Sequence, residues 1–312
     1  MAKNRRGRAI SGILILDKPA GQSSNRSLQI AKRLFDASKA GHTGSLDPLA
    51  TGVLPLCFGE ATKFSQFLLD SDKAYRSTFL LGVITASGDA DGDVVESRDA
   101  SPVTEAAVMA GLEQFSGEID QIPSMFSALK HNGQPLYKLA RQGLEVERKS
   151  RRVTVYDIQL EAFRSGEQTG GNPEVDVYIR CSKGTYVRSI AEDLGLALGC
   201  GAHVKMLHRV QAGPFLEQQA VSLDALEVLK QKDEFLSLDN LLLPADCAVM
   251  HLAKVEMAAS EQFYMLQGQP VQISGSPTDG VVRMYGESGS FLGIGEILDD
   301  GRVGPKRLIA TN

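Results

Sequence analysis

The segment that most constrains this chain is residues 41–52, GHTGSLDPLATG, in which one carboxylate lies among three glycines and a proline. Pro48 disfavours the helical conformation for Asp47 and favours extended backbone there. The glycines permit sharp turns and the close approach of another backbone. The segment therefore predicts a stiff, compact loop that presents Asp47. An aspartate in such a turn can also serve only to accept hydrogen bonds from nearby amides, so the loop alone leaves its role open.

The elements on either side of this loop are apolar, which predicts that core elements hold it in place. Residues 12–16 (GILIL) and residues 53–58 (VLPLCF) are predicted as buried strands. A helix that begins at possible caps in residues 23–25 and runs to Phe35 is predicted between them, and a short helix near 61–69 follows. Catalytic residues commonly lie on loops that a rigid scaffold positions in this way.

Alternating apolar residues predict a second group of strands. They cover residues 73–85, 153–160 and 175–181. In the second of these, Val153, Val155, Asp157 and Gln159 are predicted to face away from Thr154, Tyr156, Ile158 and Leu160; in the third, Val175, Val177, Ile179 and Cys181 share one face. Further predictions are a helix over 104–115, a loop over 166–173, a helix over 186–198, a strand over 204–208 and an acidic helical stretch over 222–242.

Two other segments have distinctive composition. Residues 89–93 (DADGD) look like a calcium loop, but Ala100 stands where such a loop needs a bidentate glutamate, so an acidic turn is predicted. After a boundary at residues 243–245, the segment 250–312 alternates short apolar strands with glycines, which predicts a small β-rich module.

Charge is distributed unevenly along the chain. The net charge is −5, yet residues 1–41 hold nine Lys/Arg and two Asp, giving +7, and residues 123–152 hold seven Lys/Arg and two Glu, giving +5. Phosphates respond to such local patches and not to the total charge, although basic runs are also common as ordinary solvated surface. The basic residues 1–9 predict a segment that is disordered without RNA.

The cysteines and the hydropathy pattern favour a cytoplasmic protein. The four cysteines are scattered, without a CxxC pair or a histidine at ligand spacing, so neither a zinc site nor a disulfide framework is expected. No stretch approaches the ~20 apolar residues of a membrane span, and the N-terminus lacks an apolar signal region.

Several separate motifs together resemble one family. The loop motif at 44–52 is accompanied by residues 16–19 (LDKP), 59–63 (GEATK), 182–188 (SKGTYVR) and 199–204 (GCGAHV). In this order, over roughly residues 8–220, they resemble the bacterial tRNA pseudouridine synthase B family, which acts on the T-loop of tRNA. A lone LDP would be a weak signal, but the combination is highly specific.

The resemblance implies both a fold and an activity. The fold is α+β: a pseudouridine-synthase-type catalytic domain over 10–245 on a mixed, mostly antiparallel sheet, with a basic RNA-clamping insertion at about 123–152, and a small PUA-like module over 250–312. The activity is conversion of uridine to pseudouridine at tRNA position 55, by base flipping and an aspartate-dependent mechanism. No cofactor, metal or protein partner is implied, and the sequence contains no Walker loop or GxGxxG fingerprint.

The resemblance also assigns three catalytic residues. Asp47 is the nucleophile or base, because an aspartate with its reference pKa of about 3.9 is ionised at neutral pH. Arg188 is its partner and would keep that pKa low. Tyr75 packs on the uracil, and its hydroxyl is a candidate for removing the carbon-bound proton. Without the resemblance, Arg188 would be an ordinary surface arginine and Tyr75 a core residue with a solvated hydroxyl.

The remaining assignments concern binding. Tyr186 and Leu207 line the uracil pocket, Lys18 braces the site, and His42 occupies the stack that the flipped base leaves. Each of these has an ordinary alternative as a core or surface residue. In the insertion, the implied phosphate contacts are Lys130, Lys138, Arg141, Arg148 and Lys149.

The two rival functions are a tRNA-binding protein and a different base-modifying enzyme. A tRNA-folding helper with incidental catalysis would not depend on Asp47. A deaminase would need His/Cys zinc ligands with a nearby glutamate, a signature that this sequence lacks, and a methyltransferase would need a nucleoside-cofactor site, for which no glycine fingerprint is present.

Overall fold

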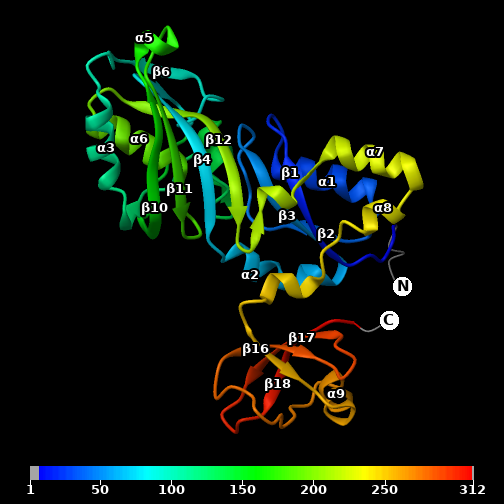
Figure 1. The fold of residues 1–312 in the computed structure, drawn as a ribbon. Helices are drawn as coiled ribbons and strands as arrows, with labels where there is room; N and C mark the ends of the chain where they lie inside the picture. The colour runs from blue at the N-terminus through cyan, green and yellow to red at the C-terminus, as the bar shows by residue number, and fades with distance from the viewer. Residues whose placement is uncertain (1–6, 311–312) are drawn as a thin grey trace.

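The computed structural model describes residues 7–310, which form a body around one large mixed sheet and a smaller C-terminal lobe (Figure 1). The strands of the large sheet, in spatial order, are β14 (Val221–Ser222), β1 (Gly12–Lys18), β3 (Thr51–Phe58), β12 (Ala202–Ala212), β4 (Lys73–Leu81), β11 (Glu174–Cys181), β10 (Arg151–Arg164) and β7 (Gly117–Gln121). Two short strands pair beside this path, β2 (Ala40–His42) with β3 and β13 (Phe215–Leu216) with β12. Most pairs are antiparallel, so the predicted α+β fold class is confirmed.

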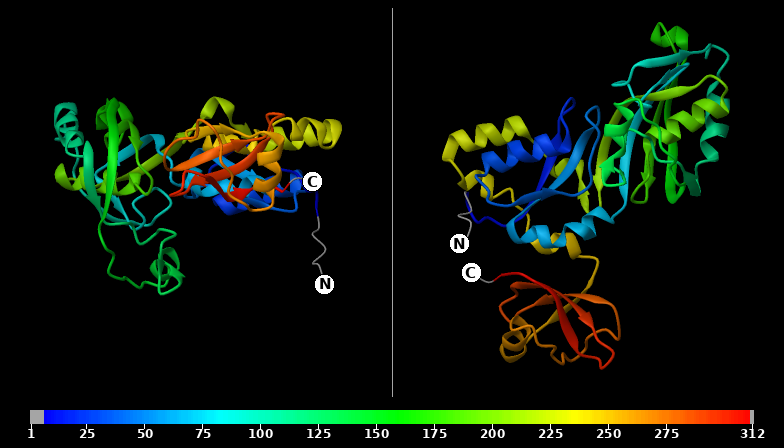
Figure 2. Two further views of the ribbon diagram at one scale, coloured as in Figure 1. Left: turned by 90° about the horizontal axis from the view of Figure 1, so that it is seen from below. Right: turned by 180° about the vertical axis from the view of Figure 1, so that it is seen from behind.

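Helices cover the two halves of the sheet separately. In one half α1 (Ser24–Leu34) and α7 (Leu223–Asp233) pack with β1 and β3, and α8 (Leu236–Asp239) lies beside α7. In the other half α3 (Glu105–Glu113) and α6 (Val187–Ala197) pack on β10 and β12 (Figures 1 and 2). Helix α1 begins at one of the predicted caps, because the Ser23 side chain accepts a hydrogen bond from the backbone N–H of Arg26.

The two halves join where β3 meets β12. These strands are parallel and share only two register pairs, His208 with Thr51 and Arg209 with Gly52. Gly52 has φ +97°, and a Cβ there would lie 2.3 Å from the carbonyl oxygen of Arg209. The loop that contains Asp47 leads directly into this junction, so the glycine lets the loop enter the sheet against β12.

We therefore expect Gly52→Ala to destabilise the fold strongly. Backbone strain and overpacking together predict a loss of about 2–5 kcal/mol in the free energy of unfolding. Gly133→Ala is the matched control, because Gly133 also has positive φ (+82°) but its added Cβ would meet nothing within 4 Å. Urea denaturation checks both variants, and equal losses in the two would contradict the close packing at Gly52.

The alternation predicted for residues 153–160 is wrong beyond Val155. A register shift in β10 between Val155 and Asp157 moves the following residues to the opposite face. Ile158 and Leu160 consequently pack on the same core cluster as Val155, while Gln159 is exposed. In β11 the prediction is confirmed, because all four alternating residues are buried.

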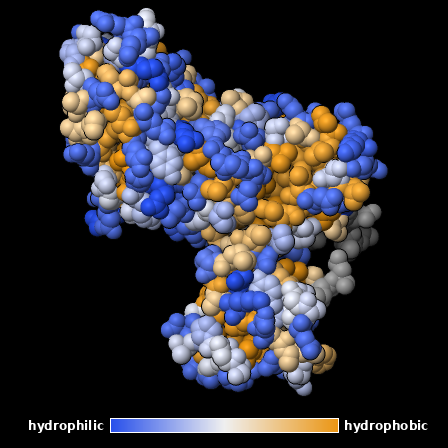
Figure 3. Space-filling model, viewed as in Figure 1, coloured by the Kyte–Doolittle hydropathy of each residue, from blue (hydrophilic) through white to orange (hydrophobic). Residues whose placement is uncertain are grey.

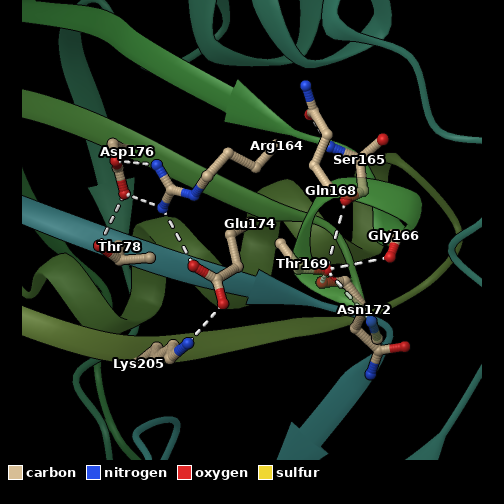
Figure 4. A network of polar contacts seen from close by, with 11 residues as sticks. Thr78, Arg164, Ser165, Gly166, Gln168, Thr169, Asn172, Glu174, Asp176 and Lys205 are labelled. Carbon is tan, nitrogen blue, oxygen red and sulfur yellow. Dashed lines mark hydrogen bonds and ion pairs between the residues drawn. The ribbon is translucent and has the colours of Figure 1, made fainter.

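Two other local predictions need correction. The strand over 73–85 is interrupted at Gly82, so that β5 (Val83–Thr85) pairs separately with β6 (Val94–Ser97). The loop over 166–173 contains the short helix α5 (Gly166–Thr169). Beside it a network of polar side chains ties β10 to its neighbours (Figure 4): Arg164 pairs with Glu174 and Asp176, Thr78 donates to Asp176, and Lys205 pairs with Glu174.

The C-terminal lobe, residues 253–310, contains a second sheet. Its strands are β15 (Ala253–Glu256), β16 (Val281–Tyr285), β17 (Phe291–Ile297) and β18 (Val303–Leu308), with helix α9 (Ala259–Leu266) beside them. The lobe joins the body through a narrow neck (Figure 3). At the contact, the rings of Phe291 and Phe64 lie 5.3 Å apart, and Lys63 in the 3-10 turn η1 (Gly59–Phe64) donates to the carbonyl of Leu308.

The prediction for the N-terminal segment has two parts. Residues 1–6 lie outside the described residues. At Arg8 the prediction of disorder is wrong, because its guanidinium pairs with Asp239 and lies 4.0 Å from the ring centre of Phe235. Within the described range, no helix is long and apolar enough to span a membrane.

Candidate active site

The loop that carries Asp47 borders a pocket of about 370 Å³. Four other residues singled out in the sequence share this pocket although they come from different elements: Tyr75 from β4, Tyr186 and Arg188 at the start of α6, and Leu207 from β12. The structure therefore brings together all three residues assigned to catalysis and two of those assigned to binding.

The loop is held rigidly from behind. Ser24, at the start of α1, hydrogen bonds through its hydroxyl to both the N–H and the carbonyl of Leu46. Lys18 is fully buried at the end of β1, and its ammonium donates to the carbonyls of Pro19, Pro48 and Ala50 at 2.8, 3.3 and 2.6 Å. Burial lowers the pKa of Lys18 to about 8. Lys18 thus braces the backbone after Asp47 and does not line the pocket.

Asp47 forms an ion pair with Arg188. The distance from Asp47 Oδ2 to Arg188 Nη2 is 3.0 Å, and the arginine side chain is only 4% exposed, compared with 37% for the aspartate. Arg188 also donates to the carbonyls of Ser87 and Phe126 at 2.8 and 3.1 Å. A guanidinium with this many fixed acceptors cannot swing away, so it holds one carboxylate oxygen of Asp47 in a defined place.

The sequence did not reveal a second carboxylate beside this pair. Asp89 is 5% exposed, and its Oδ2 lies 3.7 Å from Arg188 Nη1. It belongs to the segment predicted as an acidic turn, and a backbone bridge to Val204 in β12 places it here. Arg188 therefore lies between two acids. These three side chains form a cluster that is apparent only from the tertiary structure.

The expected low pKa of Asp47 is wrong in its net direction. Desolvation by the cleft walls raises the pKa of the Asp47 carboxyl, and Asp89 adds to this, while Arg188 and Lys18 lower it. Burial is the largest of these influences. Asp47 is consequently a stronger base than a solvated aspartate.

Two further cations border the pocket and were also missed. Arg209 is 1% exposed and donates to the carbonyls of Val53 and Gly44 at 2.7 and 3.2 Å, so it ties β12 to both ends of the Asp47 loop. Lys73 donates to carbonyls at the end of α2 (Ser65–Leu69), and burial lowers its pKa to about 8. Burial raises the pKa of the Tyr75 hydroxyl, whereas Arg209 lowers it.

His42 lies outside the pocket, at the end of β2. Its Nδ1 is buried and has no hydrogen-bond partner among residues 7–310. Burial, together with Arg209, lowers the pKa of His42 and favours the neutral imidazole. The ring is uncharged at neutral pH, which suits stacking on a base as well as it suits a core position.

The basic insertion projects from the body and has its own small core (Figure 2). It contains β8 (Lys130–His131), β9 (Gln134–Pro135) and α4 (Leu136–Ala140). Four of its predicted phosphate contacts are exposed, namely Lys130, Lys138, Arg141 and Lys149. Arg148 differs: it donates to the carbonyl of Pro123 and pairs with Glu145, so its guanidinium is engaged within the insertion. A phosphate contact by Arg148 stays a prediction.

No metal site is evident in the part of the chain that the structure describes. Residues 7–310 contain no group of three or more His, Cys, Asp or Glu side chains arranged to hold an ion.

Comparison with known proteins places this site in a family. Three family models match nearly the whole chain: "TruB family pseudouridylate synthase (N terminal domain)" over residues 32–187, "tRNA pseudouridylate synthase B C-terminal domain" over 188–250, and "Pseudouridine synthase II TruB, C-terminal" over 253–309.

Relatives and solved structures agree with these matches. The chain is 54% identical to tRNA pseudouridine synthase B of Saccharophagus degradans, with 99% of each chain covered, and 53% identical to that of Aliivibrio salmonicida, with 99% and 97% covered. A crystal structure of a Cbf5–Nop10–Gar1 complex is similar with a TM-score of 0.70 and 26% identity, covering 95% of this chain and 84% of that one. The chain therefore belongs to the TruB family and is a tRNA pseudouridine synthase, an isomerase.

Proposed function

We propose that this enzyme isomerises the uridine at position 55 in the T-loop of tRNA. The observation that carries the proposal is the Asp47–Arg188 pair at the edge of a pocket that Tyr75, Tyr186 and Leu207 also border. Such a pocket combines an apolar and aromatic wall for a base with one fixed carboxylate for the chemistry. The pocket accepts one nucleotide, and this nucleotide must leave the stacked T-loop to enter the pocket.

Asp47 is the reactive group in this proposal. The reaction breaks the bond between N1 of uracil and C1′ of ribose and forms a bond from C5 to C1′, while C5 loses a proton and N1 gains one. Because no electrons or groups are exchanged with another molecule, the reaction requires no cofactor. An ionised carboxylate can act as nucleophile or base, and Arg188 orients it.

Tyr75 supports the base and is a candidate for accepting the proton from C5. Its ring belongs to the pocket wall, where a planar uracil can pack on it. Tyr186 and Leu207 complete the wall, and Lys18 keeps the Asp47 loop in place from behind. Tyr186, Leu207 and Lys18 thus position the nucleotide and the loop, while Asp47 and Tyr75 take part in the chemistry.

Base flipping and binding of the RNA backbone involve residues outside the pocket. His42, five residues before Asp47, occupies the position in the stack that the flipped base leaves. Stacking on a base contributes about 1–3 kcal/mol, which is comparable to the cost of extracting a nucleotide. Lys130, Lys138, Arg141 and Lys149 contact the phosphates of the T-arm.

Neutralising two insertion lysines is expected to weaken tRNA binding and to reduce its salt dependence. For Lys138→Gln with Lys149→Gln, the slope of log Kd against log salt should fall by about 1–2. Each phosphate contact that is lost reduces the number of counterions released when tRNA binds. The control is Arg33→Gln with Lys232→Gln, which removes the same charge from exposed positions on α1 and α7, the helices that cover the other half of the sheet. Filter binding at several salt concentrations measures both. An unchanged slope for the insertion pair would remove these residues from the interface.

The position within tRNA is tested with a T-loop hairpin. A hairpin labelled with tritium at C5 of the uridine at position 55 should release its label, whereas one labelled at the neighbouring uridine should not. Release from the neighbouring position at a similar rate would contradict the assignment.

The remaining proposals concern organisation. We place a catalytic domain at residues 10–245 and a PUA-like RNA-binding module at 250–312. The similar solved complexes contain further protein chains, but this chain matches tRNA synthases over its full length, so we propose that it acts alone on tRNA. The four free cysteines fit a reducing cytoplasm. Activity of the purified chain, without any added protein, tests its independence.

A further inference from the structure

Ser127 has an unusual environment for a serine. It lies in the insertion, is only 3% exposed, and its hydroxyl oxygen is buried without a hydrogen-bond partner among the described residues. Buried hydroxyls nearly always have a partner, because leaving one unpaired costs free energy. An unpaired one calls for an explanation.

The location of Ser127 supplies that explanation. Ser127 borders the same pocket as Asp47, Tyr75 and Arg188. It is therefore the point at which the insertion reaches the site of the chemistry, together with the two residues that follow it.

The backbone around Ser127 is fixed by two contacts. The carbonyl of Ser127 accepts a hydrogen bond from the N–H of Tyr137 in α4, at 3.1 Å. The carbonyl of the preceding Phe126 accepts from Arg188, the residue that pairs with Asp47. Ser127 is thus tied both to the insertion and to the catalytic pair, and only a rotation of its side chain is needed to redirect the hydroxyl.

A neighbouring serine shows that such hydroxyls can be satisfied within the insertion. Ser124 accepts a hydrogen bond from the N–H of Phe126 at 3.1 Å and does not border the Asp47 pocket. Among the described residues Ser127 has no equivalent local partner, and it borders the pocket into which a nucleotide can enter.

We propose that Ser127 is a substrate-binding residue whose hydroxyl hydrogen bonds to the target nucleotide. A serine hydroxyl can donate and accept, which matches either the ribose 2′-hydroxyl or the polar edge of uracil. This inference rests on the proposed function, since it takes the nucleotide that enters the pocket to be the uridine that reacts. The insertion then recognises the nucleotide itself as well as the phosphates.

The test is single-turnover kinetics of Ser127→Ala on the T-loop hairpin, with the enzyme concentration varied up to saturation and the temperature at least 15 °C below the melting temperature of each variant. We expect a loss of about 5- to 30-fold in rate or apparent affinity, typical of an unpaired group left in a binding site. The melting temperature should not fall, because no protein hydrogen bond is removed. Ser124→Ala, the matched control, should keep the parent rate.

A hairpin with 2′-deoxyuridine at the target position locates the contact. If Ser127 binds the 2′-hydroxyl, the losses from Ser127→Ala and from the deoxynucleotide will not add; if it binds the uracil edge, they will. Parent kinetics for Ser127→Ala on the unmodified hairpin would overturn the inference while leaving the proposed function intact. If the parent enzyme failed to isomerise this hairpin, the proposed function and the inference would both fail.

Discussion

Asp47→Asn is expected to reduce the rate of pseudouridine formation by about 10⁴-fold or more, the scale found when a nucleophile is removed from an active site. Asparagine has nearly the same shape and leaves the loop, its glycines and its brace at Lys18 unchanged. It cannot supply the negative charge that the chemistry needs, and among the described residues that line the pocket Asp47 is the only carboxylate. Asp89, next to Arg188, is 5% exposed and does not border the pocket.

Binding distinguishes this loss from a failure to fold or to recognise tRNA. The Kd of Asp47→Asn for tRNA should stay within about threefold of the parent, because phosphate contacts supply most of the affinity for nucleic acid. Single-turnover assays and filter binding on the same preparation measure both quantities. A variant that binds and reacts like the parent would favour the rival function of a tRNA-folding helper.

Arg188→Gln is expected to lower the rate by about 10²–10³-fold, the range seen when one electrostatic partner is removed from a catalytic centre. The glutamine cannot replace the guanidinium between Asp47 and Asp89, so the two acids then repel each other without a cation between them. Loss of the donor to Phe126 also loosens the start of the insertion. Arg76→Gln is the control, because Arg76 pairs with acids at a surface site where it is half exposed.

The pH profile separates the electrostatic role of Arg188 from a structural one. Asp47 must be ionised, so kcat/KM should fall as the pH drops through the pKa of Asp47. Because desolvation raises this pKa, the acid limb should lie above the value of about 3.9 for a solvated aspartate. Removing the positive charge of Arg188 should move the limb to still higher pH. A limb that moves to lower pH in Arg188→Gln would contradict the proposed pairing.

Local sequence signals predicted the elements around the site. The apolar runs at 12–16 and 53–58, the cap at Ser23 and the proline after Asp47 each act over a few residues, and each corresponds to an observed element or turn. The alternation in β11 was equally readable. In β10 it failed because a bulge adds a residue to one strand, and the hydrophobic pattern of a single strand does not show where its partner lacks a residue.

Long-range contacts explain what the sequence could not supply. Asp89, Lys73, Arg209 and Ser127 reach the site through strand register, a backbone bridge or the insertion. Asp89 lies in the segment predicted as an acidic turn, and the other three belong to no motif that indicates chemistry. The direction of the Asp47 pKa also depended on burial, which spacing does not reveal. Conversely, Arg148 looked like its basic neighbours in the sequence and differs only because Pro123 and Glu145 lie next to it in space.

In the proposed mechanism the carboxylate of Asp47 drives isomerisation without a cofactor. The most direct test is release of tritium from C5-labelled uridine at position 55 of a T-loop hairpin, with purified protein and no added cofactor, for the parent and for Asp47→Ala. We expect complete release by the parent and no release above background by the variant. Release by Asp47→Ala at the parent rate would contradict it.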